Sequence, residues 1–146
     1  MNTRVERRLT VESLEEIIDM LHIHLEYTNL TPLNRDGDYN LDTNTIRLQE
    51  GMNHRLHRSV LAHEIAHALY GHRRSKFGPV NLKQERQADD WAAYYLITID
   101  EYRIAETIHD GHAPSIAYDL DVTTELVHAY QRILTRLNQA TKELTS

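Results

Sequence analysis

The stretch from Leu56 to Tyr70 constrains the fold most, because it places two histidines on one face of a helix that is apolar on the other. In an α-helix, His63 and His67 lie about 40° apart around the axis, and Glu64 lies about 60° beyond His67. The opposite side, roughly 140° to 240° from His63, carries four apolar residues, Leu61, Ile65, Ala68 and Leu69. The pattern predicts a helix that buries one side and presents polar groups on the other.

Both ends of this helix are marked in the sequence. Asn53 is a residue type that caps helix N-termini, and Gly71 is the type that most often follows a helix C-terminus. Beyond Gly71 the chain is basic and rich in turn residues as far as Pro79. Such a composition is typical of a solvated loop whose positive charge complements the helix C-terminus.

The polar face suits zinc chemistry. Two neutral imidazoles can bind one Zn²⁺ ion at about 2.0–2.1 Å each, and a glutamate beside them can act as general base on water. The pair His63 and His67 supplies the imidazoles, and Glu64 supplies the carboxylate. Chance is the alternative, because ten histidines in 146 residues make one such pair unsurprising. A third ligand elsewhere in the chain would favour the metal site.

A second predicted helix, from about Asn81 to Ile97, offers that ligand. Glu85 and Asp89 are four residues apart and therefore lie about 40° from one another on one face. A catalytic zinc site needs a third protein ligand and leaves a fourth position to water, so we predict Glu85 as the ligand. Asp89 is placed to accept the outer ring N–H of a ligating histidine. The alternative is an ordinary charged helix surface.

Two other kinds of ligand set are excluded by counting. An extended motif with a third histidine would need Gly at position 70 and His at position 73, where the chain has Tyr70 and Arg73. The chain contains no cysteine, so thiolate ligands and thiol nucleophiles are absent. A carboxylate from the second helix is therefore the leading third ligand.

Length and charge limit the class of protein. A chain of 146 residues fits one domain with room for a small appendage, and its low content of Gly and Pro favours helix. A net charge of −6 argues against an extended surface for nucleic acid. No run approaches the roughly 18 apolar residues of a membrane span. We expect a cytoplasmic protein that binds neither membrane nor, directly, nucleic acid.

The first third of the chain predicts a helix and a small sheet. Thr10 is a candidate cap for an amphipathic helix that continues to about Leu25 or Tyr27. Turn residues then separate two alternating stretches, Tyr39–Leu41 and Thr45–Leu48, which predict an antiparallel pair. Such a sheet next to a metal could hold an extended substrate by main-chain hydrogen bonds, or it could be purely structural.

The last third motivates a rival function. Asp100 is a candidate cap for a short helix through His109, and Ser115–Val127 has the pattern helix, tight turn, helix. This pattern resembles the DNA-binding helix-turn-helix. The rival function is therefore a DNA-binding or protein-interaction regulator that uses this helix pair, in which the histidine cluster would form a purely structural metal site. The would-be recognition helix, however, begins at Thr124 and has no basic residue before Arg132. A packing module or a surface for a protein partner fits it better.

The two metal-site segments together resemble the ImmA/IrrE family of zinc metallo-endopeptidases. These segments are His63–His72 and Glu85–Leu96, and the resemblance is specific over Leu61–Ile97. It implies zinc ligands at His63, His67 and Glu85, and a catalytic glutamate at Glu64. Two departures are Trp91, where the family usually has Phe, and the segment after Ile97, which lacks the usual Pro.

The resemblance also implies a biological setting and a substrate. Family members are often encoded by phages, mobile elements or stress-response loci, and cleave a helix-turn-helix transcriptional repressor. We therefore expect an α+β fold: a mostly helical zincin-like peptidase domain with a small antiparallel sheet over residues 1–99, and a helical, helix-turn-helix-like extension over residues 100–146 packed on it. Four residues are candidates for stabilising the oxyanion: Tyr70, His72, Tyr94 and Tyr95.

Overall fold

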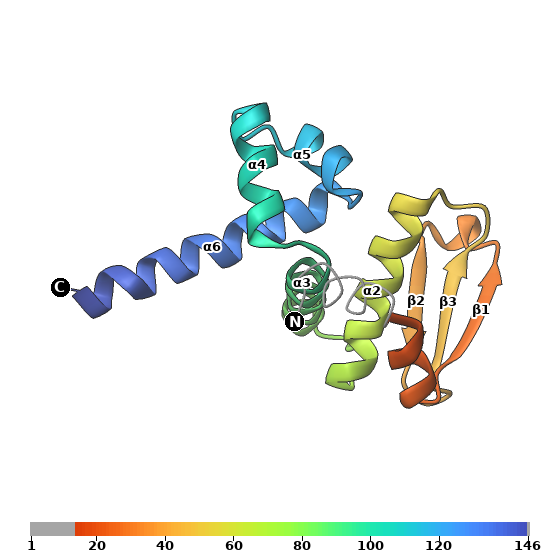
Figure 1. The fold of residues 1–146 in the computed structure, drawn as a ribbon. Coiled ribbons are helices and arrows are strands. Elements are labelled where there is room, and N and C mark those ends of the chain that lie inside the picture. The colour runs from red at the N-terminus through yellow and green to blue at the C-terminus, as the bar shows by residue number, and fades with distance from the viewer. Residues whose placement is uncertain (1–13, 146) are drawn as a thin grey trace.

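Three short strands from the first third of the chain form one mixed sheet in the computed structural model, which describes residues 14–145 (Figure 1). The strands are β1 (His24–Thr28), β2 (Gly37–Asn40) and β3 (Thr45–Gln49), with a 3-10 turn, η1 (Thr31–Leu33), between the first two. Their order is β1-β3-β2, with β2 antiparallel and β1 parallel to β3. The predicted hairpin is confirmed, but the sheet is not purely antiparallel.

The first strand corrects a prediction. Residues 14–20 are helical, but the helix does not reach Leu25 or Tyr27, because His22 adopts a left-handed φ of 55° and the chain turns into β1. In β1, Leu25 pairs with Ile46 and Tyr27 pairs with Leu48 of β3. Sheet pairing thus overrides a local helical periodicity. The predicted cap at Thr10 lies outside the described residues.

The histidine-bearing helix is α2 (His54–Tyr70), and its predicted ends are confirmed. The side chain of Asn53 accepts a hydrogen bond from the backbone N–H of Leu56 at 2.9 Å, and Gly71 ends the helix with a φ of 65°. Helix α2 packs on one face of the sheet (Figure 1), and Ile65 of its apolar side and Ile46 of β3 are both fully buried. Leu69, which the sequence predicts on the same apolar side, is 43% exposed. The sheet therefore lies along one side of α2, and the next helix packs on another part of its surface.

That next helix is α3 (Gly78–Leu96), which starts three residues before the predicted Asn81. Pro79 lies in its first turn, where a missing N–H costs nothing and the fixed φ suits a helix. Ala88 and Ala92 of α3 are fully buried, so their small side chains allow α2 and α3 to approach closely. This close packing brings the polar residues of α3 beside the histidines.

Three further helices complete the fold, namely α4 (Ile99–His109), α5 (Ala113–Leu120) and α6 (Thr124–Thr145). Thr98, not the predicted Asp100, caps α4 by accepting a hydrogen bond from the backbone of Glu101. The pair α5 and α6 confirms the helix-turn-helix pattern, and α6 continues to Thr145, projecting away from the body (Figure 1).

The architecture is α+β and mostly helical, as predicted from the sequence. Buried residues from the sheet and from helices α2 to α6 join in one hydrophobic core. Among the residues that the structure describes, no helix has both the length and the hydropathy required to cross a membrane.

Candidate metal centre and cleft

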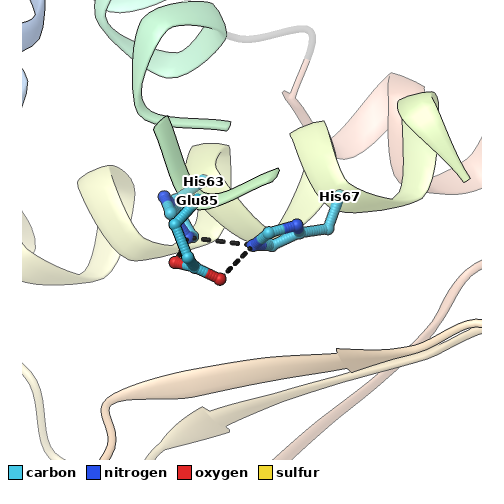
Figure 2. A group of neighbouring side chains, drawn as sticks. All are labelled: His63, His67 and Glu85. Atoms are coloured by element: carbon cyan, nitrogen blue, oxygen red, sulfur yellow. Dashed lines mark hydrogen bonds and ion pairs between the residues drawn. The ribbon is translucent and has the colours of Figure 1, made fainter. Parts of the chain in front are cut away.

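Three potential ligand residues meet where α2 and α3 pack together (Figure 2). His63 and His67 project from successive turns of α2, and Glu85 projects from α3. The Nε2 atom of His63 lies 3.0 Å from Glu85 Oε2, and that of His67 lies 3.1 Å from Glu85 Oε1. The two Nε2 atoms are 3.0 Å apart. The structure thus brings together the three residues that the sequence predicts as ligands.

The outer ring nitrogens have their own partners. Nδ1 of His63 lies 2.8 Å from a carboxylate oxygen of Asp89, and Nδ1 of His67 lies 3.0 Å from Nδ1 of His72. An ionised carboxylate only accepts hydrogen bonds, so His63 must donate from Nδ1 to Asp89. In its neutral form His63 therefore presents a lone pair at Nε2. Asp89 occupies the position that the sequence predicts for it.

The chemistry of this donor set calls for a cation. Lone pairs of neutral imidazole Nε2 atoms and carboxylate oxygens repel one another when they converge, unless a positive charge lies among them. A tetrahedral zinc site with bonds of about 2.0–2.1 Å separates its ligand atoms by about 3.3 Å, close to the observed 3.0–3.1 Å. The group fits a single metal ion with little rearrangement.

Without a metal, the close contacts between these histidines and carboxylates shift the pKa values of His63 and Glu85. Burial alone would lower the pKa of His63, but hydrogen bonds to Asp89 and Glu85 and the nearby negative charges outweigh it and raise the pKa to about 10. Hydrogen bonds from His63 and His67 hold the pKa of Glu85 well below its usual range. A proton is thus held where a metal ion would bind.

Glu64 lies beside the ligands in a different environment. It is only 5% exposed, and it lines the cleft described below. Burial raises the pKa of Glu64 to about 7, although the positive charges of His63 and His67 oppose the shift. A carboxyl group with a pKa near neutrality can both accept and release a proton at physiological pH.

The centre opens into a cleft of about 1030 Å³ between the helices and the sheet. Its helical wall includes Glu64, His67 and Glu85, and its opposite wall is β2 with the turn that follows. Because β2 is the last strand in the sheet order, its outer edge pairs with no strand in the described part of the chain. An edge strand thus runs along the cleft that contains the potential ligands.

Charged groups on the cleft wall were not predicted from the sequence. Asp38 of β2 is paired with Arg35 at 3.1 Å and with Arg47 of β3. Partial burial would raise the pKa of Asp38, but the hydrogen bonds and charges of these two arginines outweigh it and lower the pKa. Asp38 and Arg47 lie opposite each other in the paired strands β2 and β3. Only a correct prediction of the strand register could have identified this ion pair, because no sequence motif marks it.

Of the four described candidates for oxyanion stabilisation, only His72 lines the cleft. Tyr70 stacks against the His72 ring, Tyr95 stacks on Trp91, and Tyr94 is 72% exposed. Both ring nitrogens of His72 are already engaged, one by His67 and the other by Gln87 at 2.8 Å. Burial lowers the pKa of His72. In this arrangement His72 has no ring N–H free for substrate.

Comparison with known proteins identifies a family but no individual relative. A family model described as the IrrE N-terminal-like domain, Peptidase_M78, matches residues 18–130. The matched region spans the sheet, helices α2 to α5 and the first turns of α6. A search of curated proteins found no match to the chain.

Proposed function

Because the chain belongs to the IrrE N-terminal-like family, Peptidase_M78, a family of metallopeptidases, we propose that it is a zinc-dependent endopeptidase. One observation carries the proposal beyond the family: the Nε2 atoms of His63 and His67 and the Glu85 carboxylate converge within 3.1 Å of one another at the wall of an open cleft. A purely structural zinc site would fill its fourth position with a protein ligand and would need no base.

In this proposal each residue has a distinct role. His63, His67 and Glu85 hold the zinc ion, which when bound lowers the pKa of water and polarises the scissile carbonyl. Glu64, in its ionised form, accepts the proton of the attacking water and then delivers it to the leaving amine. Asp89 keeps the proton of His63 on Nδ1 and so orients the ring.

The substrate is a polypeptide bound in extended form. The free edge of β2 can pair with such a segment by main-chain hydrogen bonds and align it with the ligand residues across the cleft. The resemblance to ImmA/IrrE proteins suggests a helix-turn-helix repressor as the protein cleaved. We assign the peptidase to residues 1–99 and treat residues 100–146 as a helical extension packed on it through α3 and α6.

Cleavage of a repressor encoded beside the gene tests both the activity and the role of Glu64. Zinc-loaded wild type should convert the repressor to two fragments, seen by gel electrophoresis and mass spectrometry. Glu64→Gln should slow cleavage by about 10²- to 10⁴-fold, because the general base is lost. It should still bind zinc, because Glu64 is not a ligand. Equal turnover by both proteins would refute the role of Glu64.

The contacts of α6 favour the peptidase over a DNA-binding regulator. The first turn of α6 carries Glu125, which would repel phosphate, and the first arginines of the helix, Arg132 and Arg136, both bind Asp90 of α3 at 3.0 Å. These arginines thus form ion pairs within the protein, where their charges are partly neutralised by Asp90. A salt-dependent shift of duplex DNA at low protein concentration would support the DNA-binding alternative.

A further inference from the structure

We propose that His72 and Gln87 form a hydrogen-bond relay that positions His67 for the metal. This inference rests on the proposed function, since it concerns how one zinc ligand is held. It assigns a role to two residues outside the ligand set, one on the loop that follows α2 and one on α3.

Gly71 brings His72 back onto α2. With Gly71 at a φ of 65°, the backbone N–H of Gly71 bonds the carbonyl of Ala68 at 3.1 Å, and that of His72 bonds the carbonyl of His67 at 2.9 Å. This is the Schellman arrangement, which needs a left-handed residue at Gly71. The Nδ1 atoms of His72 and His67 are 3.0 Å apart, so backbone and side chain both join these two residues.

The contact between Gln87 and His72 determines which ring nitrogens of the relay carry hydrogens. The carbonyl oxygen of Gln87 accepts from Nε2 of His72 at 2.8 Å, so that nitrogen carries the hydrogen. The Nδ1 atom of neutral His72 is then an acceptor, and Nδ1 of His67 must donate to it. In its neutral form His67 consequently presents the lone pair of Nε2 toward Glu85 and His63, as a metal ligand requires.

The two histidine ligands are thus held by different acceptors. His63 is held by a carboxylate, Asp89, whereas His67 is held by a neutral imidazole that is itself oriented from α3. The stacked ring of Tyr70, 5.3 Å away and nearly parallel, limits rotation of His72. Loss of the outer partner of a ligating histidine typically weakens metal binding about 10- to 100-fold.

Zinc affinity of the full chain, measured by competition with a chromogenic chelator, tests the relay. We expect His72→Ala to weaken affinity about 10- to 100-fold, because Nδ1 of His67 loses its acceptor. Gln87→Met should weaken affinity in the same direction, and Gln87→Glu, which keeps an acceptor, should stay within about twofold of wild type. Gln84→Met is the matched control on α3, and it should also stay within about twofold.

A second measurement uses Co²⁺ in place of Zn²⁺. The visible absorption of bound Co²⁺ reports ligand geometry, and it should change in His72→Ala and Gln87→Met but not in Gln84→Met. Gln87 is exposed, so its variants should fold normally, which circular dichroism can check. Wild-type affinity in both His72→Ala and Gln87→Met would overturn the relay, as would equal weakening by Gln84→Met.

The zinc-affinity measurements and the cleavage assay together distinguish failure of the relay from failure of the proposed function. If wild type binds zinc with the predicted dependence on His72 and Gln87 but cleaves no protein, the relay stands and the peptidase assignment fails. If wild type cleaves its substrate while the relay variants bind zinc as it does, only the relay fails.

Discussion

Two carboxylates in the centre have opposite electrostatic environments. Glu85 is bonded by His63 and His67, which hold its pKa well below the usual range, whereas burial raises the pKa of Glu64 to about 7. When two neighbouring acids have environments that shift their pKa values in opposite directions, they can take different chemical roles. Glu85, which stays ionised near neutral pH, suits a metal ligand, and Glu64, which titrates near neutrality, suits proton transfer.

Asp38 gives a prediction about acid stability. Its pKa in the folded protein is below the unfolded value of about 3.9, so its contribution to stability is present above about pH 4 and is lost as the pH falls through the folded pKa. We expect Asp38→Asn to lower the free energy of unfolding by about 1–3 kcal/mol at neutral pH. The difference from wild type should shrink below about pH 4.

Urea denaturation at several pH values measures this difference. Asp42→Asn is the control, because Asp42 forms an exposed pair with Arg73 and such pairs contribute about 0–1 kcal/mol. A difference between wild type and Asp38→Asn that stays constant from pH 7 to pH 3 would contradict the assignment.

At the scale of elements, the contact between α2 and β2 sets the distance between the metal centre and the cleft wall. A Cβ atom at Gly37 would lie 2.8 Å from Val60 Cγ1 and 3.2 Å from the carbonyl oxygen of Arg47. No side chain fits there without movement. Gly37 therefore allows the edge strand to lie close against the helix that carries His63 and His67.

Gly37→Ala should lower the free energy of unfolding by about 1–3 kcal/mol, because it overpacks this contact. It should also impair substrate cleavage, because β2 must move away from α2. Combining it with Val60→Ala should recover part of the stability, since the nearest clashing atom is removed. Equilibrium denaturation of the single and double variants measures both effects.

Gly78→Ala is the control for this prediction. Gly78 begins α3, and an added Cβ there meets nothing within 4 Å. We expect a change within about 0.5 kcal/mol. Equal destabilisation by Gly37→Ala and Gly78→Ala would show that the loss of stability in Gly37→Ala does not come from the contact with Val60.

At the scale of the whole molecule, metal binding and folding should be linked. The three ligands come from two helices that are separated by the loop between Gly71 and Gly78, so they converge only in the folded chain. A ligand that binds only the folded state stabilises it by about 2.7 kcal/mol when its concentration is 100 times Kd. Zinc should therefore raise Tm, and a strong chelator should reverse the rise.

Thermal unfolding monitored by circular dichroism, with and without zinc, tests this linkage. Glu64→Gln should keep the rise in Tm, because it retains all three ligands, whereas Glu85→Ala should lose most of it. Glu26→Ala, a change at another cleft carboxylate, should behave like wild type. A zinc-induced rise of normal size in Glu85→Ala would exclude Glu85 from the ligand set.

Some structure followed from sequence because it depends on neighbours along the chain. Helical spacing alone put His63, Glu64 and His67 on one side of α2, and the residue types of Asn53 and Gly71 marked its ends. The hairpin followed from alternation around a turn. Each of these features depends on contacts within a few residues.

Other features depend on contacts between residues that are distant in the chain, so they could not be predicted from local patterns. His24–Thr28 has a helical apolar pattern but becomes a strand because β3 is available to pair with it. The contact of His72 with Gln87 and the closeness of β2 to Val60 likewise arise from packing between separate elements. Local spacing along the chain was enough to identify the residues that could hold a metal ion. Their surroundings depend on how separate helices and strands pack together, which local spacing does not specify.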